Sequence, residues 1–277
     1  MAAKPSALKG NEILIDDSTD NDLLFDPVVD GEKKGRGGIP RDYSVQPVDW
    51  FSDPPSNMQI IPKTEWSERI KELEAQKALL SHVRGDIASL DQNGQGYCWF
   101  YSNSGVVTIL RKKANLPYIR FSAHAGACKI KNFKDEGGWC GLSADFWKST
   151  GCPTVEFWPE KSMSKQHDNA ATWENAAKHK VTEDWVDLGK AVYDRNLTFD
   201  QVATCLLLGL PCAVDFNWWG HSVCALDLVE VEPGDFGIRI WNSWSDGWGE
   251  KGTSVLRGSK ARPDGAVCLR VTTPSDV

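Results

Sequence analysis

The chain has 277 residues with 31 basic and 38 acidic side chains, a formal net charge of −7, and 41% hydrophobic residues, enough for a sizeable core. The acidic balance supplies no basic stripe of the kind that phosphate binding needs, so we expect no nucleic-acid partner. No apolar run approaches the length that spans a bilayer, and the first residues lack the apolar stretch of a secretory signal, so we expect no membrane contact and a cytoplasmic location.

Cysteine usage fits a reducing compartment. The eight cysteines are expected to stay mostly reduced, because disulfides are rare in a cytoplasm. None forms a CxxC pair and the chain has five histidines, so we expect no structural zinc site. We interpret seven of the eight as buried free thiols, since cysteine packs as a small hydrophobic residue.

Residues 1–60 differ in composition from the rest of the chain. They hold eleven acidic and six basic residues, so most of the net charge lies there, and they are rich in Asp, Gly and Pro. Such a composition buries too little apolar surface to offset the entropy of ordering, although short apolar patches within it can dock onto a surface. We predict an extended acidic N-terminal arm that covers a cleft or joins subunits of a homo- or hetero-oligomer.

Helices are predicted in the first half of the body. Apolar residues recur at three- and four-residue steps from Thr64, and Gly85 suits the stop of that helix. Further helices are predicted over 98–113 and 142–150. A fourth helix is predicted to start at Thr198, where Thr-Phe-Asp-Gln reads as a capping box, and to end at Gly209.

Strands follow the helices. After Pro211 the sequence changes to short apolar runs separated by glycine-rich turns, which predict strands. These runs cover 212–216, 222–231, 237–241, 253–256 and 267–271. Helices first and strands later are typical of an α+β protein with a helical layer and an antiparallel β layer.

Three segments carry residues suited to covalent acyl transfer. Cys98 would be the first residue of a helix, where unpaired N–H groups and the helix dipole stabilise a thiolate and lower its pKa. His221 precedes an apolar strand, and Asn242 lies in the run Trp-Asn-Ser-Trp. Together they supply a nucleophile, a base and a side chain that orients the base. Each segment alone is more often structural, and their joint occurrence favours catalysis.

These segments resemble those of papain-like cysteine peptidases over roughly residues 60–272. Gln92 lies six residues before Cys98, the family's spacing for the glutamine that helps to bind the oxyanion, and Cys98 is followed by tryptophan as in that family. The runs 242–244 and 247–250 match the family's Asn-Ser-Trp and Gly-Trp-Gly-Glu, and Gly137-Gly138 resembles its cleft-lining pair. As a whole, the chain resembles the signal-less, prodomain-less members from bacteria and bacteriophages.

The resemblance implies a fold and a set of site residues. It implies a two-lobed fold, with a helical lobe at about 61–160 and an antiparallel β-barrel-like lobe at about 161–277. It implies a polypeptide substrate that is cleaved through a thioester, with no metal and no cofactor. The implied catalytic residues are Cys98, His221, Asn242 and Gln92. The implied substrate-binding residues are Gly96, Gly137, Gly138 and Trp244.

The chain also departs from the family pattern. Gln95 replaces the family's first cysteine in the loop before the nucleophile, so the usual disulfide of that loop is absent. Tyr97 and Phe100 replace small residues, and either narrow the cleft or pack elsewhere. Ser245 replaces the glycine after Asn-Ser-Trp.

Two other functions remain open. The domain can serve as a structural or attachment component of an assembly such as a phage virion, with weak or no peptidase activity. The same three residues can also pass the acyl group to an amine, which would make the protein a transamidase or a deamidating enzyme.

Overall fold

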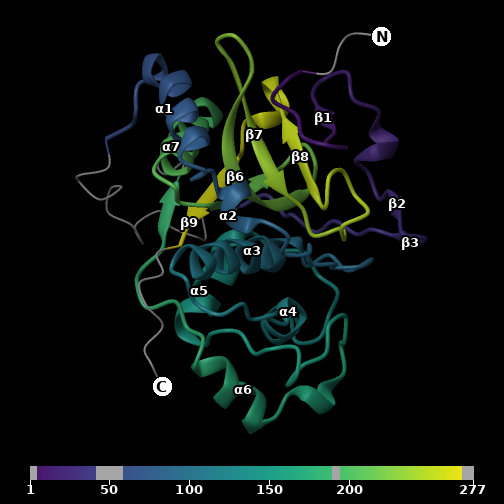
Figure 1. The fold of residues 1–277 in the computed structure, drawn as a ribbon. Coiled ribbons are helices and arrows are strands. Elements are labelled where there is room, and N and C mark those ends of the chain that lie inside the picture. Colours follow the sequence, from purple (N-terminus) through teal and green to yellow (C-terminus); the bar gives the residue numbers. More distant parts are fainter. Residues whose placement is uncertain (1–4, 42–58, 189–193, 270–277) are drawn as a thin grey trace.

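The chain forms two lobes in a computed structural model that describes residues 5–41, 59–188 and 194–269. Figure 1 shows α3, α4, α5 and α6 gathered in one lobe and the large sheet, with α1 and α7, in the other. A helical lobe beside a sheet lobe confirms the predicted α+β class. The domain boundaries near residues 60 and 160 stay predictions.

The helical lobe is built around α3 (Cys98–Lys113), as predicted. This helix is buried from Cys98 to Arg111 because it lies between the sheet and the other helices. Gly105 allows close approach to the sheet, since a Cβ there would lie 3.1 Å from the Cβ of Cys224. The remaining helices of this lobe are α4 (Ala123–Ile130), α5 (Cys140–Ser149) and α6 (Ala170–Ala177).

The sheet lobe has seven strands in the order β1-β8-β7-β6-β5-β9-β4. All five strands predicted after Pro211 are present, as β5 (Cys212–Phe216), β6 (His221–Glu232), β7 (Asp235–Trp241), β8 (Thr253–Leu256) and β9 (Gly265–Cys268). Four short strands of the described residues were not predicted from the sequence: β1 (Leu14–Ile15), β2 (Val28–Val29), β3 (Glu32–Lys33) and β4 (Val186–Leu188). Strands of two or three residues are too short for a period-2 pattern to be recognised.

Two helix predictions need correction. The segment predicted as one helix from Thr64 to Gly85 forms α1 (Lys63–Ala75) and α2 (Leu80–Arg84), with Lys77 at φ 55° in the break. Helix α7 (Arg195–Leu207) starts before the predicted capping box, because Asp194 caps it by accepting from the N–H groups of residues 196 and 197. An aspartate at the N-cap satisfies the same orphan donors that the capping box would have satisfied.

The described part of the arm packs along the sheet lobe. Strand β1 adds to the sheet edge in parallel with β8, and β2 and β3 form a hairpin. Ile15 and Leu24 are buried, which confirms that apolar patches of the arm dock onto the body. Glu12 is buried in an ion pair with Arg239, at 2.6 Å. Figure 1 shows this stretch as the purple chain at the side of β8.

None of the helices in the described part of the chain combines the length and the apolar character needed to cross a membrane.

Candidate active site

Cys98 lies at the N-terminus of α3, with its side chain fully buried. Donor groups of Ser222 and Gly37 lie near its sulfur, so one neighbour comes from β6 and the other from the arm. Burial raises the pKa of the Cys98 thiol to about 11 in spite of these donors. The predicted lowering of this pKa by the helix N-terminus is therefore wrong for this state, because desolvation is the larger effect.

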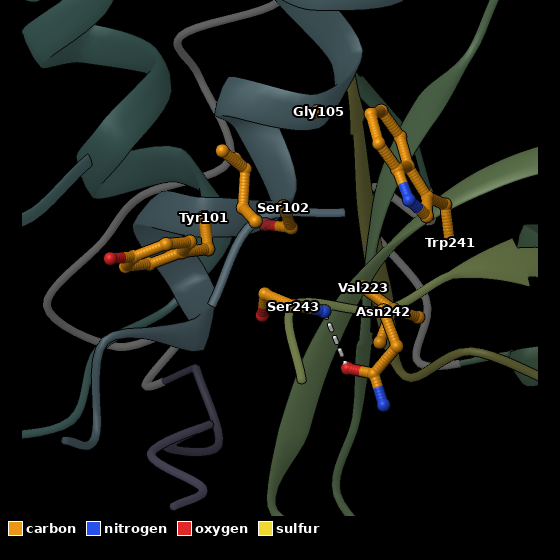
Figure 2. Close-up of a pocket in the computed structure, with 8 residues that line it drawn as sticks. Tyr101, Ser102, Gly105, Val223, Trp241, Asn242 and Ser243 are labelled. Atoms are coloured by element: carbon orange, nitrogen blue, oxygen red, sulfur yellow. Dashed lines mark hydrogen bonds between the residues drawn. The ribbon is translucent and has the colours of Figure 1, made fainter. Parts of the chain in front are cut away.

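His221 starts β6 and is oriented by Asn242. Its Nε2 lies 2.8 Å from Asn242 Oδ1, which also accepts from the backbone N–H of Ser243 at 2.8 Å (Figure 2). Since this oxygen can only accept, Nε2 carries the proton and Nδ1 is left with a lone pair. His221 Nδ1 has no hydrogen-bond partner among the described residues. Burial lowers the pKa of His221 to about 3, so the imidazole is neutral.

Tryptophan rings enclose this imidazole. Trp244 stacks on it with ring centroids 4.6 Å apart, and Trp219 meets it edge-on at 4.8 Å. Trp248 packs against both tryptophans. The aromatic walls exclude water and hold the ring plane in place. Trp244 was singled out from the sequence; Trp219, two residues before the histidine, was not.

Gln92 is held in a fixed orientation by Ser243. Its Oε1 accepts from Ser243 Oγ at 2.5 Å, which places Nε2 as the donor toward the groove between the lobes. Nε2 donates to the carbonyl of Gly35 in the arm at 3.1 Å and to that of Gln95 at 2.8 Å. Figure 2 shows Asn242 and Ser243 lining a small pocket opposite Tyr101 and Ser102 of α3. The volume of this pocket is about 10 Å³.

Residues 35–39 of the arm, the cleft segment, lie extended in this groove. Gly38 N–H donates to Gly220 O of the sheet lobe at 2.8 Å. On the helical lobe, Gly138 accepts from Ile39 N–H and donates to Gly37 O, both at 2.9 Å, in a parallel bridge. The groove therefore already binds an extended peptide through main-chain hydrogen bonds.

Each of the four predicted substrate-binding residues contacts the cleft segment. Gly138 forms the parallel bridge, and Trp244 Nε1 donates to Gly35 O at 3.0 Å. Gly96 and Gly137 lie so close to Gly37 that a Cβ on Gly37 would be 2.0 Å from Gly96 O, and one on Gly137 would be 2.4 Å from Gly37 O. The structure brings these four residues together, and their role toward a substrate stays a proposal.

The bulky residues beside Cys98 pack away from the groove. Tyr97 donates its hydroxyl to Lys134 O at 2.8 Å and meets the ring of His124 edge-on. Phe100 stacks on Trp147 and covers Gly126, where a Cβ would collide with its ring. Of the two alternatives left open by the sequence, packing elsewhere is correct, because both rings contribute to the core of the helical lobe.

Asp215 is a buried acid that sequence reasoning missed. It lies in β5, accepts from the N–H of Cys140 at 3.2 Å and bonds Ser222 Oγ. Burial raises the pKa of this carboxyl, and its negative charge contributes to the raised pKa of the Cys98 thiol. The available signal was a charged residue inside the apolar run Cys-Ala-Val-Asp-Phe, since acids are almost never fully buried unless paired.

Three cysteines form a cluster away from this site. All eight cysteines are buried and none forms a disulfide, and the sulfur atoms of Cys205, Cys212 and Cys268 lie within 4.8 Å of one another. Burial and the neighbouring thiols raise the pKa of Cys212 well above its usual value. A structural zinc site takes four ligands, and this group has three members among the described residues, so it does not complete one.

Comparisons with known proteins identify the fold. No protein-family model and no curated protein matches the sequence. Among solved structures, xylellain, a cysteine protease from Xylella fastidiosa, matches with 17% identity and a TM-score of 0.58, over 87% of this chain and 98% of that chain. A recombinant stem bromelain precursor matches with 15% identity and a TM-score of 0.59, over 87% and 78%.

A third match is digestive procathepsin L2 proteinase from Tenebrio molitor larval midgut, with 18% identity and a TM-score of 0.54, over 72% of this chain and 67% of that chain. At these identities the likeness shows the fold alone. The fold is therefore that of papain-like cysteine proteases, as the sequence resemblance implied.

Proposed function

We propose that this protein is a cysteine-type endopeptidase that is latent in the described state. The observation that carries the proposal is the imidazole of His221. Its Nε2 is held by Asn242 at 2.8 Å, and donor groups of the next residue in the chain, Ser222, lie near the sulfur of Cys98. These contacts support the proposal that a base with a free lone pair, an orienting amide and a thiol act together beside the groove that holds the cleft segment.

Hydrolysis would proceed through a thioester at Cys98. Nδ1 of His221 takes the thiol proton, the thiolate attacks the substrate carbonyl, and the imidazolium then protonates the leaving amine. A water molecule that is deprotonated by the same imidazole hydrolyses the thioester, which restores the free thiol. The backbone N–H of Cys98, which lacks an acceptor in its own helix, and Gln92 Nε2 would bind the oxyanion. Asn242 holds the imidazole plane throughout.

The cleft segment accounts for the latency. The main chain of Gly37 lies near the sulfur of Cys98, so the cleft segment covers the proposed nucleophile. Gly35 O occupies Gln92 Nε2, the group proposed to bind the oxyanion. With water excluded, the thiol and the imidazole are both neutral. Movement of the segment would rehydrate both groups and favour the thiolate–imidazolium pair.

The test uses the full chain with Gly37→Val, a substitution that the groove cannot accommodate beside Gly96. Cleavage of an unfolded protein should appear in this variant and vanish when Cys98→Ala is added. Cys152→Ala is the matched control, because Cys152 is an equally buried thiol in the helical lobe that bonds Ser122 O. Cleavage that survives Cys98→Ala would refute the assignment of the nucleophile.

A second candidate is a structural role in an assembly such as a virion, for which the filled groove is the favouring observation. In that case the cleft segment is a permanent part of the fold. Cys98 of the Gly37→Val variant would then react with iodoacetamide no faster than the other buried thiols, and no protein substrate would be cut.

A further inference from the structure

The guanidinium of Arg41, at the end of the described part of the arm, is held by two residues of the body. Its Nη1 lies 2.6 Å from Asp187 Oδ2, and its Cζ lies 4.3 Å from the centre of a ring of Trp139. The Arg41 side chain is 8% exposed and that of Asp187 is 1% exposed. A cation is thus both stacked on an aromatic face and paired with a carboxylate away from water.

The two partners come from opposite walls of the groove. Trp139 directly precedes α5 in the helical lobe and follows Gly138, the residue that pairs with the cleft segment. Asp187 lies in β4 at the edge of the sheet lobe. The arm runs from Cys98 past Gly138 to this position, so the guanidinium occupies a continuation of the peptide-binding groove.

A second carboxylate of the sheet, that of Asp215, lies on the same side of the sheet as that of Asp187. Asp187 pairs with Val267 of β9, and Asp215 pairs with Gly265 two residues along that strand. Directly opposite residues, and residues two apart along a strand, project to one face of a sheet, so both carboxylates project to the same face. That face contacts the helical lobe, since Asp215 bonds the N–H of Cys140.

Arg36, the other arginine of the described arm, is held differently. Its guanidinium pairs with Asp26 at 2.9 Å and lies over Phe25, and both of these partners belong to the arm itself. On the body, its Nη1 donates to the carbonyl of Trp219. The contacts of Arg36 therefore stabilise the fold of the arm itself. The contacts of Arg41 instead identify a cation-binding site formed by residues of the body.

We propose that Trp139 and Asp187 form a specificity subsite that binds a basic side chain, arginine above lysine, of a substrate peptide lying on the Gly138 side of the scissile bond. Arginine is favoured because its flat guanidinium stacks on an indole and pairs with a carboxylate at once. In the latent state Arg41 occupies the subsite. The inference deepens the proposed peptidase function and rests on it.

Peptide cleavage tests the subsite. The full chain with Gly37→Val is given matched fluorogenic peptides that carry arginine or citrulline at successive positions on both sides of the scissile bond. Citrulline keeps the shape of arginine and lacks its charge. A charge-assisted hydrogen bond contributes about 1.5–3 kcal/mol, so at one position the arginine peptide should have a kcat/KM about 10- to 150-fold above its citrulline partner. Equal cleavage at every position overturns the proposal.

Variants assign the preference to residues. Asp187→Asn should reduce the arginine-to-citrulline ratio at least tenfold, because the amide keeps the shape and loses the charge. Asp145→Asn is the matched control: this α5 carboxylate accepts from Trp185 Nε1, and Trp185 packs on Trp139. It should leave the ratio unchanged. A ratio that falls equally in both variants, or in neither, assigns the preference elsewhere and refutes the role of Asp187.

Binding separates this inference from the proposed function. With Cys98→Ala and Gly37→Val together, calorimetry should show tighter binding of the arginine peptide than of the citrulline peptide, by at least tenfold, and Asp187→Asn should abolish the difference. If no peptide is cut by any variant and this difference in binding remains, the peptidase proposal fails and the subsite stands. If peptides are cut without any preference for arginine, the peptidase proposal stands and the subsite proposal fails.

Discussion

Replacing Gly37 with valine should drive the cleft segment out of the groove while the rest of the arm stays in place. A Cβ on residue 37 would lie 2.0 Å from Gly96 O and 2.5 Å from Gly96 Cα. These are backbone atoms, so no side-chain rotation relieves the collision. Gly96 is also held from the other side by Asp135, which accepts its N–H at 2.7 Å.

The magnitude follows from what the segment would lose. Its main chain makes six hydrogen bonds to nitrogen and oxygen atoms of the body, at 2.8–3.1 Å. Each contributes about 1 kcal/mol net. We expect valine at residue 37 to break the three nearest to it, those made by Gly37 O, Gly38 N–H and Ile39 N–H. The closed state then loses about 3 kcal/mol, which should raise the exposure of Cys98 about 100-fold.

The assay is carbamidomethylation of Cys98 by iodoacetamide, followed by mass spectrometry of the peptide that contains it. Gly31→Ala is the matched control, because Gly31 has a positive φ of 78° in the β2–β3 hairpin and a Cβ there meets nothing within 4 Å. It strains the arm without touching the groove. If Gly37→Val is labelled at the wild-type rate while it unfolds at the wild-type temperature, the segment does not gate access to Cys98.

Three further outcomes are expected. Asn242→Ala in the Gly37→Val protein should lower kcat about 10- to 100-fold with little change in KM, because the imidazole loses its orienting acceptor; an unchanged kcat in steady-state assays would contradict this. Burial lowers the pKa of His221 to about 3, so the stability that depends on a neutral imidazole is complete above pH 6.5 and is lost as pH falls toward 3. Between pH 7 and pH 4.5 the free energy of unfolding in urea should therefore fall by about 3 kcal/mol more in the wild type than in His221→Gln. Glu12→Ala should cost about 3–5 kcal/mol in urea unfolding because it breaks a buried ion pair, whereas Lys63→Ala, at an exposed pair, should cost less than about 1 kcal/mol.

The residues around Cys98 were predictable because their chemistry is local. A glycine-containing loop followed by an apolar run marks the start of a helix, and the histidine and asparagine each lie next to a strand with a strong apolar pattern. Long elements such as α3 and β6 leave enough residues in a pattern for the period to be recognised. The spacing of Gln92 from Cys98 then carried the resemblance, and the structure places its amide beside the groove with its orientation set by Ser243.

A position of the arm over a cleft was one of the two predicted alternatives, but its path through the groove was not predictable, because its contacts are made by the main chain. Gly35, Gly37 and Gly38 suggest flexibility by composition, yet each faces backbone atoms of the body at a distance that excludes a Cβ. The sequence shows the glycines, but it does not show the surface of the body against which a side chain would not fit. The Asp215 and Asp187 carboxylates were missed for a related reason, since their partners come from segments far away in the chain.

Activation must move a short stretch of the arm rather than remove the whole of it. Glu12 and Arg239 form a buried ion pair, and Ile15 and Leu24 are buried in the body, so the stretch before residue 30 is part of the fold. A cut after Arg41 would therefore leave the cleft segment covalently attached to a strand of the sheet. The segment itself has no buried apolar side chain to hold it, because Ile39 is 51% exposed. A peptide that offers the groove the same main-chain hydrogen bonds and an arginine for Asp187 can thus compete with it, while β1 stays paired with β8.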